Sequence, residues 1–217
     1  MPDRLVLIHT VPPLVDVFKR LCAELLPDVQ LYHVLDEPLL ERVRQHQGLA
    51  TDDLAQLQAH IDVAAQIGAR AVLVTCSTLS PGVDHITANI PIVKIDEAMI
   101  AQAVGLGRSI GVIATAQSTL EPTCLLLTTA AHSRNKSIEI QTTLVDHALA
   151  SLLQGDGATH DRLVAQAIAE MSPQVNVVVL AQASMARVID VRPQPERKIP
   201  ILTSPHTAIE RVRQYLT

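Results

Sequence analysis

Cys76 is the residue whose type and position point most directly to chemistry. It follows the apolar run 71–75 and is itself followed by the hydroxyl side chains of Ser77 and Thr78. A thiol at the start of a helix, where backbone N–H groups are free, has a lowered pKa and lies beside a place for an anion. The alternative is a buried cysteine that serves as a small hydrophobic residue. Because polar residues flank it, we interpret Cys76 as a catalytic thiol.

A second apolar run ends at Gln182, and the two halves of the chain can be laid over each other. The segments that match are Arg4–His9 with Ser109–Thr115, and Val72–Cys76 with Val178–Gln182. His9 is as far from Cys76 along the chain as Thr115 is from Gln182. The sequence therefore predicts an internal duplication in which glutamine stands where a symmetric protein would carry a second reactive thiol.

Short apolar runs alternate with longer amphipathic stretches, which is the pattern of β-α units around a parallel sheet. Apolar residues at helical spacing predict helices over residues 52–68, with Thr51 as the N-cap and Gly68 at the end, and over residues 159–171. We expect strands near residues 4–10, 29–34, 71–76 and 92–93, repeated near residues 109–114, 137–142, 176–182 and 199–202.

These elements predict an α/β protein of two pseudo-symmetric Rossmann-like lobes, each a parallel four-stranded sheet flanked by helices. Lobe 1 is expected to comprise residues 1–96 and 205–217, and lobe 2 residues 97–204. Because ligands of such sheets bind beyond the carboxyl ends of the strands, we expect the active site in the cleft between the lobes. Four candidate residues lie at the matched strand ends: His9, Cys76, Thr115 and Gln182.

Composition excludes several classes of function. Hydrophobic residues make up 48% of the 217 residues but aromatic residues only 1%, and the formal net charge is −5. Few aromatic rings and no basic excess argue against nucleic-acid binding. The apolar runs are too short to cross a bilayer and no segment has the layout of a signal peptide, so we expect a soluble cytoplasmic protein with no membrane partner. Three scattered cysteines and no closely spaced histidine pair predict neither a disulfide framework nor a metal site.

Three short motifs resemble one family. Thr75-Cys76-Ser77-Thr78 is similar to the first-half Cys-Asn-Thr signature of the aspartate/glutamate/hydantoin racemase superfamily. Residues 110–115 with Ser118 and Thr119 resemble its strand and loop with spaced threonines. Residues 180–185 resemble the second-half Leu-Gly-Cys-Ala-Gly-Met segment of hydantoin racemases. The resemblance covers essentially the whole chain.

The resemblance implies a cofactor-independent enzyme in which two cysteines flank the α-carbon of the substrate. One thiol removes a proton and the other delivers one to the opposite face. It implies that Cys76 is the first thiol and that Gln182 falls where the second should be. The same resemblance assigns substrate or carboxylate binding to Ser77, Thr78, Thr115, Ser118, Thr119, Ala183 and Ser184, and the matched strand end adds His9.

Gln182 departs from the family pattern, because an amide has no accessible pKa for acid–base work. Three alternatives to two-thiol racemisation stay open. Cys76 could protonate the enolate left by a decarboxylation, add as a nucleophile to a double bond as in the family's maleate isomerases, or act with a histidine (His9, His206 or His85) in place of the second thiol. Gln182 itself either stabilises an oxyanion through its N–H₂ group or marks a lobe that has lost catalysis.

The sequence therefore predicts a cofactor-independent isomerase or racemase that acts at a carbon next to a carboxylate (or hydantoin-like carbonyl), using Cys76. The alternatives are a single-cysteine decarboxylase of the same superfamily and a catalytically silent protein that binds a small carboxylic acid. Because Phe and Tyr are nearly absent, the substrate is expected to be a compact polar acid, such as an amino-acid-like molecule. The resemblance also implies a homodimer or a larger homo-oligomer.

Overall fold

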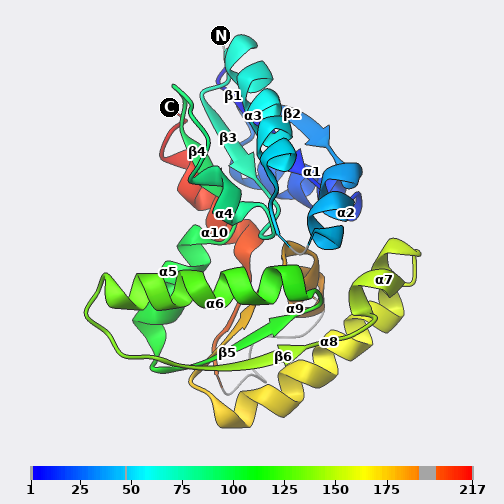
Figure 1. Ribbon diagram of the computed structural model, residues 1–217, viewed down its shortest axis with the longest axis vertical. Coiled ribbons are helices and arrows are strands. Elements are labelled where there is room, and N and C mark those ends of the chain that lie inside the picture. Colours follow the sequence, from blue (N-terminus) through cyan, green and yellow to red (C-terminus); the bar gives the residue numbers. More distant parts are fainter. Residues whose placement is uncertain (1, 47, 191–198, 217) are drawn as a thin grey trace. The chain divides into compact units, whose positions relative to one another are not determined.

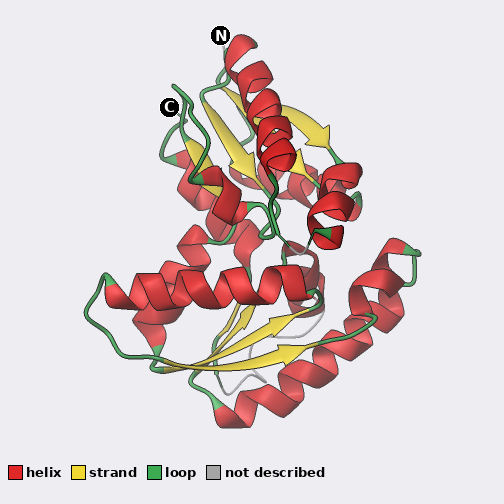
Figure 2. Cartoon of the chain, in the orientation of Figure 1, coloured by secondary structure: helices red, strands yellow, loops and turns green. Residues whose placement is uncertain are grey.

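The computed structural model describes residues 2–46, 48–190 and 199–216. The chain divides into two compact units, one made of Met1–Ile95 with Pro205–Thr217 and the other of Asp96–Ser204. Each unit contains one four-stranded parallel sheet with helices packed against it (Figures 1 and 2). The predicted α/β class and the predicted pair of parallel four-stranded sheets are therefore confirmed.

The sheet of the first unit has the strand order β2-β1-β3-β4. Its strands are β1 (Arg4–His9), β2 (Gln30–Leu35), β3 (Ala71–Val74) and β4 (Ile92–Lys94). The central strands β1 and β3 are almost entirely buried, which explains their continuous runs of Val, Leu and Ile. Strand β2 lies at an edge of the sheet and none of its residues is fully buried.

The helices of the first unit are α1 (Pro13–Leu25), α2 (Glu37–Gln45), α3 (Thr51–Gln66), α4 (Ser80–Val83) and α10 (Ser204–Arg213), which leads into the C-terminal segment. Helix α3 confirms the predicted helix, but Thr51 is its first residue and not its cap. Instead, the Asp53 carboxylate accepts a hydrogen bond from the Ala50 amide at 3.0 Å and satisfies a free N–H at the helix start. Gly68 follows the helix with a φ of 74°, a left-handed conformation that favours glycine.

The sheet of the second unit has the order β6-β5-β7-β8. Its strands are β5 (Ser109–Ala114), β6 (Glu139–Leu144), β7 (Val177–Leu180) and β8 (Ile201–Leu202). Helix α8 confirms the helix predicted over residues 159–171. The helical elements of this unit are α5 (Glu97–Leu106), α6 (Gln117–His132), α7 (Ala148–Leu153), α8 (Gly157–Met171) and α9 (Arg187–Asp190), with short 3-10 turns η1 (Ser172–Gln174) and η2 (Ala183–Ala186).

Both faces of the second sheet are covered. Val112 of β5 and Val179 of β7 pack in one apolar cluster with α5 and α6, whereas Ile113 and Val178 pack in another with α8. Figure 1 shows α6 and α8 on the two sides of this sheet. Successive residues of a strand point to opposite faces, so an uninterrupted apolar run is what a doubly covered strand requires. Polar chemistry is thereby confined to the strand ends.

The register of the two sheets shows how the halves of the chain correspond. The Thr75 amide donates to the Ile8 carbonyl at 2.9 Å, and in the second unit the Ala181 amide donates to the Ile113 carbonyl at 2.9 Å. Ile8 therefore matches Ile113. The shared strand order and direction are what an internal duplication predicts.

This register corrects the overlay drawn from sequence spacing. Counting two residues on from the matched isoleucines pairs Thr10 with Thr115, whereas the sequence overlay placed His9 on Thr115. The overlay was wrong by one residue because equal separation along the chain does not record which residues pair across strands. Cys76 still matches Gln182, since each stands one residue after a matched amide.

Candidate active site

Cys76 lies just beyond β3, at the carboxyl end of a central strand, and is 8% exposed. The Leu79 amide donates to the Cys76 carbonyl at 3.0 Å and closes a turn before the four-residue helix α4. A helix therefore does begin near the thiol, as the sequence indicated, but only after this turn.

Burial raises the pKa of the Cys76 thiol, because a buried thiolate loses the solvation that water provides. Hydrogen bonds from the Thr10 hydroxyl, from the amides of Leu79 and Thr78 and from the Thr78 hydroxyl lower that pKa, but burial has the larger effect. The expectation of a lowered thiol pKa is therefore wrong, although the backbone N–H groups act in the predicted direction. At neutral pH the Cys76 thiol carries its proton.

Two buried hydroxyls accompany this thiol. In the part of the chain that the structure describes, Thr10 Oγ1 and Ser77 Oγ have no nitrogen or oxygen partner, and the two residues are only 2% and 4% exposed. Burying a hydroxyl without a partner costs free energy, so such groups indicate a place where a ligand or water completes the hydrogen bonding. Ser77 is a predicted carboxylate-binding residue. Thr10 is not among the residues that the sequence predicts for the site, because the sequence overlay puts His9 at that strand end.

His9, Thr75 and His33 form a hydrogen-bonded chain across β2, β1 and the end of β3. The Thr75 hydroxyl donates to the Ile8 carbonyl at 2.9 Å, so it accepts from His9 Nδ1 at 2.8 Å. With its proton on Nδ1, His9 accepts at Nε2 from His33 Nδ1 at 2.9 Å. The planes of the two rings are inclined by only 16°, and their centroids are 5.1 Å apart.

His9 is predicted to bind substrate, but neither of its ring nitrogens is free to do so. Both nitrogens form hydrogen bonds with other residues, and the side chain is fully buried. Burial and the neighbouring His33 lower the pKa of His9 to about 3, so the imidazole is neutral at pH 7. Such a ring is unsuited to replace a second thiol. The other two histidines considered for that role, His85 and His206, are exposed, and His206 Nδ1 lies 4.0 Å from Glu210 Oε1.

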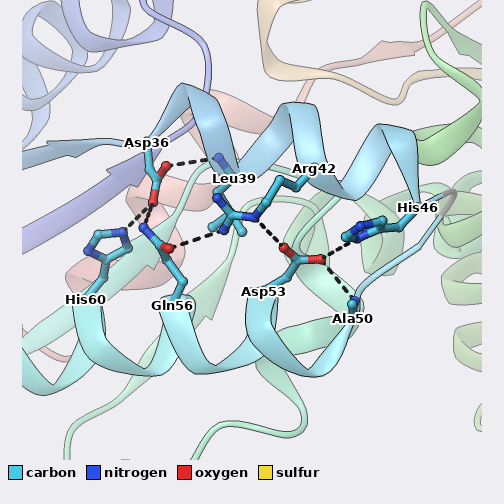
Figure 3. A network of polar contacts seen from close by, with 8 residues as sticks. All are labelled: Asp36, Leu39, Arg42, His46, Ala50, Asp53, Gln56 and His60. Carbon is cyan, nitrogen blue, oxygen red and sulfur yellow. Dashed lines mark hydrogen bonds and ion pairs between the residues drawn. The ribbon is translucent and has the colours of Figure 1, made fainter.

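A network of buried carboxylates fixes the chain after β2 (Figure 3). The Asp36 amide donates to the His9 carbonyl at 2.9 Å. The Asp36 carboxylate accepts from His60 Nε2 at 2.7 Å, from Gln56 Nε2 at 2.8 Å and from the Leu39 amide at 3.0 Å. Burial acts to raise the pKa of Asp36, but the hydrogen bonds outweigh it and leave this pKa below its ordinary value.

Asp53 is the second carboxylate of the network and is fully buried. It accepts from Arg42 Nε and from the Ala50 amide, each at 3.0 Å, and these bonds outweigh burial and lower its pKa. Gln56 joins the two carboxylates, since its Oε1 accepts from Arg42 at 3.2 Å while its Nε2 donates to Asp36. The network therefore ties α2 to α3 and, through the Asp36 amide, to the end of β1.

In the second unit, Gln182 follows β7 and precedes η2. Its Oε1 accepts two hydrogen bonds from Thr115, one from the backbone amide at 2.6 Å and one from the hydroxyl at 2.9 Å. Its Nε2 forms no hydrogen bond with any other residue that the structure describes. The two residues matched by the duplication to Thr10 and Cys76 are thus in direct contact, as Thr10 and Cys76 are in the first unit.

The other predicted residues of this unit lie close to the same strand ends. Ser118 stands in the first turn of α6, and within the described residues its buried hydroxyl has no partner. Thr119 is 1% exposed, and its carbonyl accepts from the Thr123 hydroxyl at 2.8 Å. Ala183 and Ser184 are buried in η2. The cleft predicted between the lobes stays a prediction.

Within residues 2–46, 48–190 and 199–216, no three His, Cys, Asp or Glu side chains gather in a way that could hold a metal ion. No helix in these ranges is long and apolar enough to cross a membrane.

Comparison with protein families matches residues 10–212 of the chain to the Asp/Glu/Hydantoin racemase model. A comparison with curated protein sequences gives no match.

Several solved structures share the fold. An aspartate racemase from Picrophilus torridus superposes with a TM-score of 0.77 at 12% identity, over 99% of this chain and 96% of that one. A glutamate racemase from Bacillus anthracis superposes with a TM-score of 0.70 at 13% identity, over 98% of this chain and 80% of that one. An allantoin racemase from Klebsiella pneumoniae superposes with a TM-score of 0.70 at 15% identity, over 98% of this chain and 86% of that one. At these identities the likeness establishes the fold alone.

Proposed function

Because the chain belongs to the Asp/Glu/hydantoin racemase family, we propose that this racemase-type enzyme acts without a cofactor at the carbon next to a carboxylate of a small acid, with Cys76 as its thiol acid and base. One observation carries the proposal: Cys76 is accompanied by two buried hydroxyls, of Thr10 and Ser77, that have no nitrogen or oxygen partner in the described chain. The Ser77 hydroxyl is free to donate to an oxygen of a carboxylate, whereas the Thr10 hydroxyl donates to the Cys76 sulfur.

In the proposed reaction the Cys76 thiolate takes the proton from the substrate carbon and leaves an enolate, whose charge spreads onto the carboxylate oxygens. Inversion then requires that a second group deliver a proton to the opposite face of that carbon, because return of the proton by Cys76 to the same face only regenerates the starting acid. Since the resting thiol holds its proton, Cys76 must lose it before it can act as a base. Hydrogen bonds from Thr10, Thr78 and Leu79 favour the thiolate and make this loss easier.

A second candidate is decarboxylation followed by protonation on one face. Here the bond between the carbon and the departing carboxylate breaks, CO₂ leaves, and the Cys76 thiol gives its proton to the enolate. Two features favour it: the resting thiol is already protonated, and Gln182 has no titratable group with which to complete a two-thiol exchange.

Deuterium incorporation from D₂O, followed by NMR, tests both candidates. The panel contains amino acids, hydantoins, malate-type acids and malonate-type acids, and each is incubated with the unaltered protein, Cys76→Ser and Cys124→Ser. Cys124 is the matched control, because it is a half-buried thiol in the second unit. We expect exchange that is lost in Cys76→Ser and kept in Cys124→Ser.

The stereochemical course then separates the candidates. Exchange with inversion supports a racemase in which another group takes the place of the second thiol. Loss of CO₂ with capture of deuterium supports the decarboxylase. Exchange that persists in Cys76→Ser would contradict both, and saturable binding without any exchange would support a protein that binds the acid without transforming it.

A further inference from the structure

We infer, on the basis of the function proposed above, that Gln182 is a specificity-determining residue: its carbonyl oxygen occupies the two Thr115 donors that would otherwise hold a substrate carboxylate, so the second unit receives a neutral carbonyl group instead. The geometry that carries this inference is the paired contact of Gln182 Oε1 with the Thr115 amide at 2.6 Å and the Thr115 hydroxyl at 2.9 Å.

One oxygen that accepts from both the amide and the hydroxyl of Thr115 uses both hydrogen-bond donors of that residue. Thr115 is 7% exposed, so its hydroxyl has little access to water as an alternative partner. A ligand carboxylate can reach these donors only by displacing the Gln182 carbonyl, which would then need another partner of its own. The protein thus supplies from its own chain the oxygen that a bound carboxylate would bring.

The first unit shows the contrast. Thr10, which the strand register matches to Thr115, has a buried hydroxyl with no nitrogen or oxygen partner in the described residues. Cys76, which matches Gln182, has no side-chain carbonyl to fill that position. Of two equivalent threonines, only Thr115 therefore has its hydroxyl paired with a side-chain oxygen of the matched residue.

What Gln182 leaves for a ligand is its Nε2 group, which donates hydrogen bonds and cannot accept them. An amide, ester or ring carbonyl can accept from this group as a neutral oxygen. A carboxylate draws its strongest binding from several donors acting together, and two of those at this strand end are already used. The substrate class is accordingly one that presents a neutral carbonyl, and not a carboxylate, to this strand end of the second unit.

An NMR titration with acetate tests this inference at the second unit alone. The backbone amide of Thr115 is followed in the unaltered protein, in Gln182→Ala and in Gln182→Met, which keeps a side chain of similar length but has no carbonyl. We expect the Thr115 amide of Gln182→Ala to shift saturably with acetate, at an affinity at least tenfold above that of the unaltered protein. An equal response in both proteins, or none in the variant, overturns the inference.

Hydrogen exchange gives a second readout that does not depend on an emptied site. The Thr115 amide is expected to exchange at least tenfold faster in Gln182→Met than in the unaltered protein, while the amides of β5 keep their protection. Unchanged exchange at Thr115 would show that Gln182 does not hold this amide. Neither measurement needs turnover, so a failure of the proposed reaction and a failure of the role given to Gln182 are distinguishable.

Discussion

Arg42 on α2 and Asp53 on α3 form an ion pair that is buried on one side only, with Arg42 Nε 3.0 Å from Asp53 Oδ1. The carboxylate has no exposed surface, whereas the side chain of Arg42 keeps 36% of its own. A buried carboxylate depends on its partners for the solvation that water would give, so the loss of its charge is expected to matter more than the loss of an exposed charge.

Asp53→Asn is expected to lower the free energy of unfolding by about 2 kcal/mol, because Arg42 and the Ala50 amide lose a charged acceptor. Urea denaturation measures this change. The control is Asp84→Asn, which breaks the Lys94–Asp84 pair at a carboxylate that is 63% exposed and should alter stability by less than about 0.5 kcal/mol. Equal losses in the two variants would contradict the importance assigned to burial.

Stability is expected to fall as the pH drops below 6.5, because the pKa of His9 is about 3 in the folded protein. Between these pH values the histidine binds a proton in the unfolded chain but not in the native state. This difference lowers the free energy of unfolding by at most about 1.4 kcal/mol per pH unit for one such group. His33 and His160, whose pKa values burial also lowers, add to the slope. Urea denaturation at several pH values measures how steeply the free energy of unfolding falls as the pH is lowered. This slope should be smaller in His9→Gln than in the unaltered protein.

The slope, and not the stability at one pH, is the quantity to compare, since His9→Gln also disturbs the hydrogen bonds to Thr75 and His33. His85→Gln is the matched control, because it replaces an exposed histidine by the same residue. A slope in His9→Gln equal to that of the unaltered protein would mean that His9 titrates normally in the fold.

Thr10→Val is expected to slow the alkylation of Cys76 by iodoacetamide and to move its pH dependence upward, because the Thr10 hydroxyl lowers the pKa of the thiol. Thr10→Ser keeps a hydroxyl and should restore most of the rate. Mass spectrometry of the peptide that carries Cys76 separates its modification from that of Cys22 and Cys124. A Thr10→Val protein with an unshifted pH profile would show that this hydroxyl does not act on the sulfur.

Two glycines offer a paired test of packing. A Cβ added at Gly111 in β5 would lie 2.6 Å from Met171 Cγ, so Gly111→Ala should destabilise the protein by about 1–3 kcal/mol. A Cβ at Gly105 in α5 meets nothing within 4 Å, and Gly105→Ala should raise stability by about 0.5–1 kcal/mol by restricting the unfolded chain. Thermal denaturation measures both changes, and the same sign for the two would contradict the close contact with Met171.

The sheets could be predicted because the runs around Val72–Val74 and Val177–Leu180 are apolar without interruption, as strands covered on both faces must be. The position of Cys76 followed from the same pattern, since a polar segment after such a strand lies at its carboxyl end. Helix α3 was predictable for a similar reason, because its buried residues recur at helical spacing.

The details of the site escaped prediction where they depend on pairing between distant segments. Thr10 could be matched to Thr115 only through the strand register, which sequence spacing misjudged by one residue. The pKa of Cys76 depends on how deeply packing buries the sulfur, and local sequence carries no measure of that depth. The link between Asp36 and Asp53 needs α2 and α3 side by side, and neither residue belongs to a recognisable motif.

The hydrogen bonds that run from His33 through His9 and Thr75 to the Ile8 carbonyl all point the same way. A carbonyl oxygen cannot donate, so the last member of the series dictates the orientation of every hydrogen before it. Reversing one bond would require a donor where only an acceptor exists. The series therefore has a fixed polarity: it links β2, β1 and the end of β3, and it ends at a carbonyl oxygen that has no proton to pass on.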